Sequence, residues 1–161
     1  MNCKILGILV VLAGPSAAQD VPKVDTALVE SCFANAGPGE YAPQCLGAAS
    51  NQCQQQGYSS TLGITGCINA EVDAWDTILN REYKAIRADF SRLANAASDT
   101  AIDLNAQLLT AQRAWIAYRD AECMLAYARW QDGSLRGIVH ANCMMGMTAH
   151  RAIELRDMKG N

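Results

Sequence analysis

From about residue 67 onward, apolar side chains recur every three or four residues, the spacing of one face of an α-helix. One such stripe predicts a long helix from Cys67 to Ala94. A run of strong helix formers predicts a second long helix from Thr100 to Trp130, and another stripe predicts a third from Leu135 to Met158. No segment alternates between apolar and polar residues as a half-buried strand does. We therefore expect an all-α fold.

Two shorter helices are predicted ahead of the long ones. Asp25 is a good N-cap for a helix from Thr26 to Asn35, because its carboxylate can accept from the free N–H groups of the first turn. Pro43 can open another helix, from Gln44 to Gln56, and Gly57 ends it. Together these segments predict a short helical hairpin.

The connecting segments set the expected topology. Gly57–Gly66 is rich in Gly, Ser and Thr and predicts a loop, while Asn95–Asp99 predicts a break in which Ser98 or Asp99 caps the next helix. Asp132-Gly133-Ser134 predicts a turn. Short turns force successive long helices to lie antiparallel. The expected fold is an antiparallel bundle of three long helices, preceded by the helical hairpin and stapled by disulfide bonds.

The first residues have the pattern of a secretory signal peptide. Lys4 precedes an apolar block, Ile5–Ala13, and small residues stand at positions 16 and 18. The block is too short to span a membrane, which takes about 20 apolar residues. We expect cleavage before Gln19 and a free, periplasmic or secreted chain with no stable membrane insertion. The expected mature domain is 19–161, with a helical extension at 19–56 and the core bundle at 57–161.

Six cysteines remain after cleavage, an even number that indicates three disulfide bonds in an exported chain. Nearest-neighbour pairing would join Cys32 to Cys45 and Cys53 to Cys67. Cys123 and Cys143 lie equally far from Gly133 in the sequence, so the predicted turn brings them together. No Cys-x2-Cys pair occurs, which argues against a metal site made of cysteines. The six residues are Cys32, Cys45, Cys53, Cys67, Cys123 and Cys143.

Charge and motif content exclude several function classes. The formal net charge is −3 and no basic patch is present, which argues against nucleic acid as a partner. No Ser-His-Asp order or His-Glu-x-x-His helix occurs, and cysteine nucleophiles would be held in disulfides. Asp120 and Glu122 lie two residues apart on a helix and so point in different directions. We expect no catalytic residues and no cofactor.

A mixed polar stripe marks the facing sides of the first two long helices. If their turn centres near residue 97, facing residue numbers sum to about 195, which places Asp76 opposite Arg119. A guanidinium there can bind the carboxylate bidentately. We favour a buried network that fixes helix register over a small polar cleft for a ligand. The network consists of Asp76, Asn80, Tyr83, Gln112, Trp115, Arg119 and Arg151.

Two further patterns allow a functional and a structural interpretation. Trp75, Trp115 and Tyr83 are interpreted as core aromatic packing in preference to a sugar-stacking platform. In the last helix, a stripe of soft ligands could suit copper in an exported protein, but methionine commonly fills gaps in cores. We therefore predict no metal site and keep as an alternative a periplasmic copper-binding module that uses His140, Met144 and Met147. That stripe consists of His140, Met144, Met147 and His150.

Several short sequence motifs carry a family resemblance. They are Asp76-x-x-Leu79-Asn80-x-x-Tyr83, the run Ala111–Cys123, and Thr148-x-x-Arg151-x-x-Glu154-Leu155, with Gly133-Ser134 between them. In these motifs the chain resembles the lysozyme inhibitor LprI-like N-terminal domain family of exported bacterial proteins, over about Cys53 to Leu155. The resemblance implies a binding protein and not an enzyme, with lysozyme or another cell-wall-associated protein as its partner.

Inhibition of a muramidase would follow from occlusion, with an exposed loop entering the sugar cleft and meeting the catalytic carboxylates. The candidate loops are Gly57–Gly66 and Gln131–Gly137. In the second, Ser134 and Arg136 supply a hydroxyl and a positive group that can hydrogen-bond a carboxylate. One alternative is that Gly133-Ser134 only turns the chain and caps the last helix. Another is a structural envelope protein without a ligand.

Overall fold

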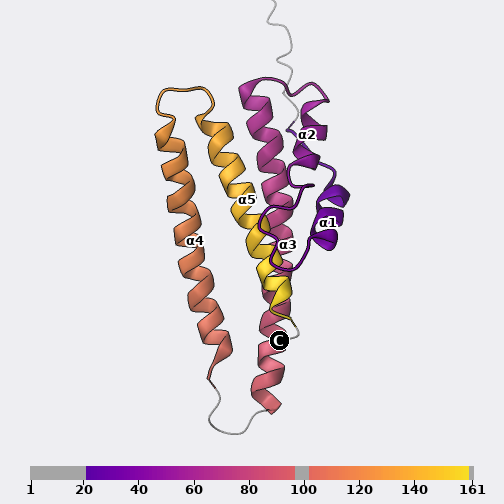
Figure 1. Cartoon of the computed structure of the whole chain (residues 1–161), viewed down its shortest axis with the longest axis vertical. Helices are drawn as coiled ribbons and strands as arrows, with labels where there is room; N and C mark the ends of the chain where they lie inside the picture. Colours follow the sequence, from indigo (N-terminus) through magenta and orange to yellow (C-terminus); the bar gives the residue numbers. More distant parts are fainter. Residues whose placement is uncertain (1–20, 97–101, 160–161) are drawn as a thin grey trace, which may run out of the picture.

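The structure is a computed structural model that describes residues 21–96 and 102–159. Helices are the only regular elements in these two ranges (Figure 1), so the predicted all-α fold is confirmed. They are α1 (Thr26–Asn35), α2 (Ala48–Gln54), α3 (Thr61–Ala96), α4 (Leu104–Arg129) and α5 (Arg136–Asp157). The predicted signal peptide and its cleavage site lie outside the described residues. None of the described helices is long and apolar enough to cross a membrane.

Three long helices form the bundle, and α5 lies between α3 and α4 (Figure 1). α5 packs along much of α3, whereas α4 contacts α5 more than it contacts α3. Three buried alanines of α5, Ala141, Ala149 and Ala152, allow the close approach to α3. α1 and α2 cover the other side of α3.

The apolar core is concentrated where α3 meets α5. Trp75, Ile78 and Ile86 of α3 and Ile153 and Leu155 of α5 are fully buried. Burial of each such side chain contributes on the order of 1.5–3 kcal/mol to stability. α4 buries much less, since only Leu108, Gln112 and Cys123 are buried along it. The core therefore holds α3 and α5 together and leaves α4 as the outer, more exposed helix.

The predicted register of α3 against α4 is confirmed near their connection. Asn105 Nδ2 donates to Ser91 Oγ at 3.0 Å, and Ile86 and Leu108 are both buried there. The residue numbers of the hydrogen-bonded pair, Ser91 and Asn105, sum to 196, close to the predicted 195. The predicted caps, Ser98 and Asp99, lie outside the described residues. α4 is instead capped by Asp103, whose carboxylate accepts from the Ala106 N–H at 2.9 Å.

Three disulfides staple the bundle with the predicted pairing. Cys32–Cys45, Cys53–Cys67 and Cys123–Cys143 have Cα–Cα distances of 5.6, 5.8 and 5.5 Å. The first joins α1 to the start of the α2 region, the second joins α2 to α3, and the third joins α4 to α5. Each closes a short loop and so stabilises the fold by about 3 kcal/mol, mainly through the unfolded state.

Three predicted helix starts are wrong, and one of them is that of the helix predicted from Thr100, which begins at Leu104 after the Asp103 cap. The predicted helix Gln44–Gln56 begins only at Ala48, because Gly47 is left-handed, with φ 89°, and breaks the helix before it. α3 begins at Thr61, six residues earlier than predicted, where Ser60 Oγ accepts from the Gly63 N–H at 3.1 Å. The predicted loop Gly57–Gly66 is thus largely the first turn and a half of α3.

Candidate functional site

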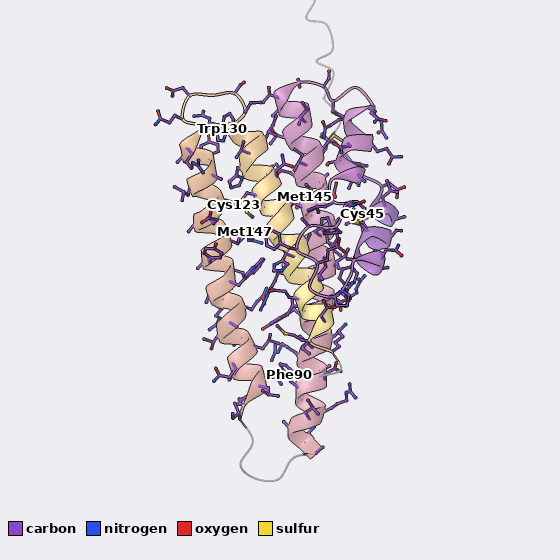
Figure 2. The ribbon with its side chains drawn as sticks, in the orientation of Figure 1. Cys45, Phe90, Cys123, Trp130, Met145 and Met147 are labelled. Atoms are coloured by element: carbon purple, nitrogen blue, oxygen red, sulfur yellow. A yellow bond between two sulfur atoms is a disulfide. The ribbon has the colours of Figure 1, made fainter. Side chains whose placement is uncertain are left out.

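The polar stripe of α4 is centred on Trp115, which is half-buried against α3 and α5. On one side of the ring a groove opens between α3 and α4, and on the other a groove opens between α4 and α5. Both arise because α4 touches its neighbours along a narrow face. Figure 2 shows Met147 and Cys123 between α4 and α5, near the second groove.

A buried hydrogen bond joins α4 to α5 beside Trp115. Arg151 Nε donates to Gln112 Oε1 at 3.0 Å, and Arg151 Nη1 donates to Glu154 at 3.2 Å. The guanidinium carbons of Arg119 and Arg151 lie 5.0 and 6.0 Å from the centre of the Trp115 ring. The electron-rich ring therefore already stabilises two cations.

The predicted ion pair between Asp76 and Arg119 is wrong. Arg119 Nη2 lies 2.8 Å from Asp120 Oδ1, and Asp76 accepts from Asn80 Nδ2 at 2.7 Å. Asp120 follows Arg119 directly in α4, so the two side chains pair within one helix and the pair does not require Asp76 of α3. Asp76 and Arg119 still line the same groove, as the register implies. They are neighbours without being direct partners.

The α3–α4 groove, of about 260 Å³, gathers six of the seven predicted network residues. Arg151 lies behind it and joins the set through Gln112. Asn80 is exposed and Asp76 half-buried, so this is not the buried network that the sequence predicted. Tyr83 Oη is buried, and no group in the described part of the chain hydrogen-bonds to it. The other lining residues are Leu79, Leu109, Arg113 and Ile116.

The α4–α5 groove is larger, about 570 Å³, and carries three aromatic side chains. Trp115 and Tyr118 come from α4, while Tyr41 comes from the connection between α1 and α2, which crosses α3 to reach α5 (Figure 1). The centres of the Tyr41 and His150 rings lie 4.5 Å apart. Sequence reasoning missed Tyr41, because no local pattern shows that this connection crosses α5. The remaining lining residues are Glu122, Asn142, Cys143, Gly146, Met147, His150 and Glu154.

The end of α5 anchors that connection. Arg156 donates to the carbonyl oxygens of Phe33, at 2.8 Å, and Gly37, at 3.2 Å, while Asp157 accepts from the Gly39 N–H at 2.7 Å. Burial alone would raise the pKa of Asp157. The hydrogen bonds from Arg156 and from the Gly39 N–H outweigh it, so the pKa lies below its usual value. Tyr41 is therefore held in place by ionic and backbone contacts.

The connection between α4 and α5 is exposed at one end of the bundle, where Figure 2 labels Trp130. Trp130 and Leu135 are each about half exposed, and Ser134 is exposed. Arg136 Nη1 donates to the Gln131 carbonyl at 3.0 Å, and its guanidinium lies 5.1 Å from the Tyr127 ring centre. Arg136 therefore braces the loop as well as adding positive charge to it.

Of the candidate copper ligands on α5, His140, Met147 and His150 pack against other groups in the structure. The His140 ring packs edge-on against Tyr127, whereas His150 lies against Tyr41, and ten helical residues separate the two by about 15 Å. Met147 Sδ lies 3.7 Å from Cys123 Sγ and 3.9 Å from Cys143 Sγ, so it packs on the disulfide. Across residues 21–96 and 102–159, no group of three or more His, Cys, Asp and Glu side chains could hold a metal ion.

A known protein family matches most of the chain. The family model described as lysozyme inhibitor LprI matches residues 52–155. The chain belongs to this family. The match includes all of α3 and α4 and nearly all of α5, so the predicted resemblance is confirmed. Tyr41 lies outside the matched segment, and the α4–α5 groove is thus built partly from the preceding extension.

A curated relative is also similar over most of its length. It is an uncharacterized protein of Rhizobium meliloti (strain 1021), 30% identical over 135 residues, which are 81% of this chain and 89% of the relative. No solved structure matches. Membership of the lysozyme inhibitor LprI family indicates an inhibitor-like protein rather than an enzyme, and points to lysozyme as the kind of partner. Together with three disulfides, it points to an extracytoplasmic location.

Proposed function

We propose that this protein is exported and inhibits lysozyme-type muramidases by placing the Gln131–Gly137 loop in their active-site cleft. Family membership is the observation that carries the proposal. In this proposal residues 1–18 are the signal peptide and 19–161 form the mature single domain. Its action is periplasmic or extracellular, where lysozyme meets the cell wall.

The shape and composition of the loop support it as the contacting element. Trp130 and Leu135 expose apolar surface at the end of the bundle, and tryptophan is among the residues that most often dominate binding energy. The Cys123–Cys143 disulfide joins the two helices that carry the loop, and Arg136 ties its base to Gln131. A braced loop loses little conformational entropy on binding, which favours affinity.

Charge supports both approach and contact. The formal net charge of −3, which becomes −4 when Lys4 leaves with residues 1–18, attracts a cationic lysozyme over distances comparable to the Debye length. Within the cleft, the exposed Ser134 hydroxyl can donate a hydrogen bond to a catalytic carboxylate. The first candidate loop, Gly57–Gly66, is a weaker candidate because most of it is helical.

A wall-lysis assay tests the proposal. Oxidised protein from Gln19 to Asn161 should inhibit at least one lysozyme type at stoichiometric excess and low salt. Trp130→Ala should weaken inhibition by about tenfold or more, as expected for an interface hot spot. Leu62→Ala is the matched control, since Leu62 is an exposed apolar residue of α3 in the weaker candidate segment Gly57–Gly66, and it should leave inhibition unchanged. Absence of inhibition for every lysozyme type, with no complex in gel filtration, would overturn the proposal.

A further inference from the structure

We propose that the α4–α5 groove is a binding site for an uncharged carbohydrate. The site is separate from the Gln131–Gly137 loop and goes beyond the proposed inhibition. Its volume, about 570 Å³, falls within the range of small-molecule sites. Its aromatic rings and its hydrogen-bonding groups come from α4, α5 and the α1–α2 connection, so the folded chain as a whole forms it.

The floor of the groove has a glycine that the packing does not require. Gly146 lies within α5, where glycine destabilises a helix relative to alanine. A Cβ at this position would meet no atom within 4 Å. By contrast, a Cβ at Gly63 would lie 2.9 Å from the backbone of Tyr58, so that glycine is needed for packing. The effect of Gly146 is to leave space in the groove.

The walls of the groove fit the two kinds of surface on a pyranose ring. The CH face of a sugar packs on aromatic rings, and Tyr41 and Tyr118 are 61% and 59% exposed there. Sugar hydroxyls need donors and acceptors. The Glu122 carboxylate, the Asn142 carbonyl oxygen and both tyrosine hydroxyls form no hydrogen bond with any described residue. These polar groups are therefore available to a ligand.

The existing charge pairs make an ionic ligand less suitable. None of the described residues that line the groove is an arginine or lysine, and the nearby Arg119 and Arg151 are already paired, with Asp120 and with Gln112 and Glu154. A cationic ligand could pair with the Glu122 carboxylate, but the Trp115 ring would add little, because two guanidinium groups already lie near it. The Tyr41 ring is likewise covered on one side by His150. A neutral ligand that uses ring contacts and hydrogen bonds meets neither obstacle.

Isothermal titration of the oxidised protein with cellotetraose and with chitotetraose tests this site, with spermidine and inorganic phosphate as charged probes. We expect saturable binding of at least one tetrasaccharide and none of either ion. Tyr118→Ala should weaken that binding by about fivefold or more through loss of a ring contact. Leu125→Ala is the matched control, because Leu125 is equally exposed on α4 but does not line the groove.

A pair of substitutions at the floor tests the location independently of the walls. Gly146→Leu should fill the groove and abolish binding, whereas Gly146→Ala should retain most of it, with thermal unfolding confirming that both variants fold. No saturable binding of either tetrasaccharide would overturn the proposal. Saturable binding of spermidine or phosphate, or full affinity in Tyr118→Ala, would overturn it as well. The wall-lysis assay is unaffected by these results, so the two proposals fail separately.

Discussion

The Glu71 carboxylate, buried in α3, accepts a hydrogen bond of 2.7 Å from the backbone N–H of Ser50 in α2. Its other oxygen accepts from the Gly47 N–H at 2.9 Å and from Trp75 Nε1 at 3.3 Å. Glu71 therefore caps α2 from a different helix, and satisfies N–H groups that a helix start leaves free. A buried carboxylate is tolerated here because backbone and indole N–H groups surround it.

Substitution of Glu71 by Gln should destabilise the protein by about 1–3 kcal/mol. Glutamine replaces one carboxylate oxygen with an NH2 group, and this donor would face a backbone N–H that needs an acceptor. Urea unfolding measures the change. Asp73→Asn is the matched control on the same helix, since Asp73 is exposed, and should change stability by less than about 0.5 kcal/mol. Equal effects of the two substitutions would show that Glu71 does not cap α2.

Two double-mutant cycles should separate the real contact from the predicted one. Gln112→Ala and Arg151→Ala should couple by about 0.5–3 kcal/mol, because Arg151 Nε and Gln112 Oε1 form a buried hydrogen bond. Asp76→Ala and Arg119→Ala should be additive within about 0.5 kcal/mol, since each has its own partner. If thermal unfolding instead showed coupling between Asp76 and Arg119 and additivity between Gln112 and Arg151, the predicted ion pair would be supported.

Anchoring of the α1–α2 connection should depend on pH through Asp157. Its pKa is lowered in the folded chain, so its contribution to stability is complete above the ordinary carboxyl pKa and is lost as pH falls. The loss should begin below about pH 4. Urea unfolding at pH 7, 4 and 2.5 measures it, and Asp157→Asn should lower stability at pH 7 more than at pH 2.5. A constant difference across this range would exclude the role of the carboxylate.

Removal of the Cys123–Cys143 bond should affect inhibition as well as stability. Replacement of both cysteines by Ser should cost about 3 kcal/mol and also loosen the helices that carry the Gln131–Gly137 loop. The matched control is replacement of Cys32 and Cys45, which lie on the other side of α3 and should lower stability without a direct effect on the loop. Similar losses of inhibition at a temperature where both variants are folded would argue against the loop.

The sequence predicted those parts of the fold that depend on local pattern and chain geometry. Helical stripes and the cap at Asp25 fixed α1, whose bounds match the prediction, and equal distances from Gly133 led to the third disulfide. The position of Glu71 under α2 could not be predicted, because the two partners are far apart in sequence and neither shows a motif. The predicted loop Gly57–Gly66 extended too far. Ser60 caps α3, so the helix begins at Thr61 although its first turn contains a glycine.

The candidate site was only partly predictable for a similar reason. Antiparallel register brought Asp76 and Arg119 to the same groove, but it could not show that the adjacent Asp120 would take the guanidinium. Tyr41 joins the second groove through a connection held by Arg156 and Asp157, contacts that span more than a hundred residues of sequence. Such contacts depend on the packed bundle and have no local signal.

The proposed inhibition requires the Gln131–Gly137 loop to enter the cleft of a lysozyme. Amide hydrogen exchange of the oxidised protein, alone and with a stoichiometric lysozyme that it inhibits, tests this most directly. We expect slower exchange at the amides of this loop in the complex, with little change at the Gly57–Ser60 connection at the same end of the bundle. A complex that leaves the exchange of the Gln131–Gly137 loop unchanged would contradict it.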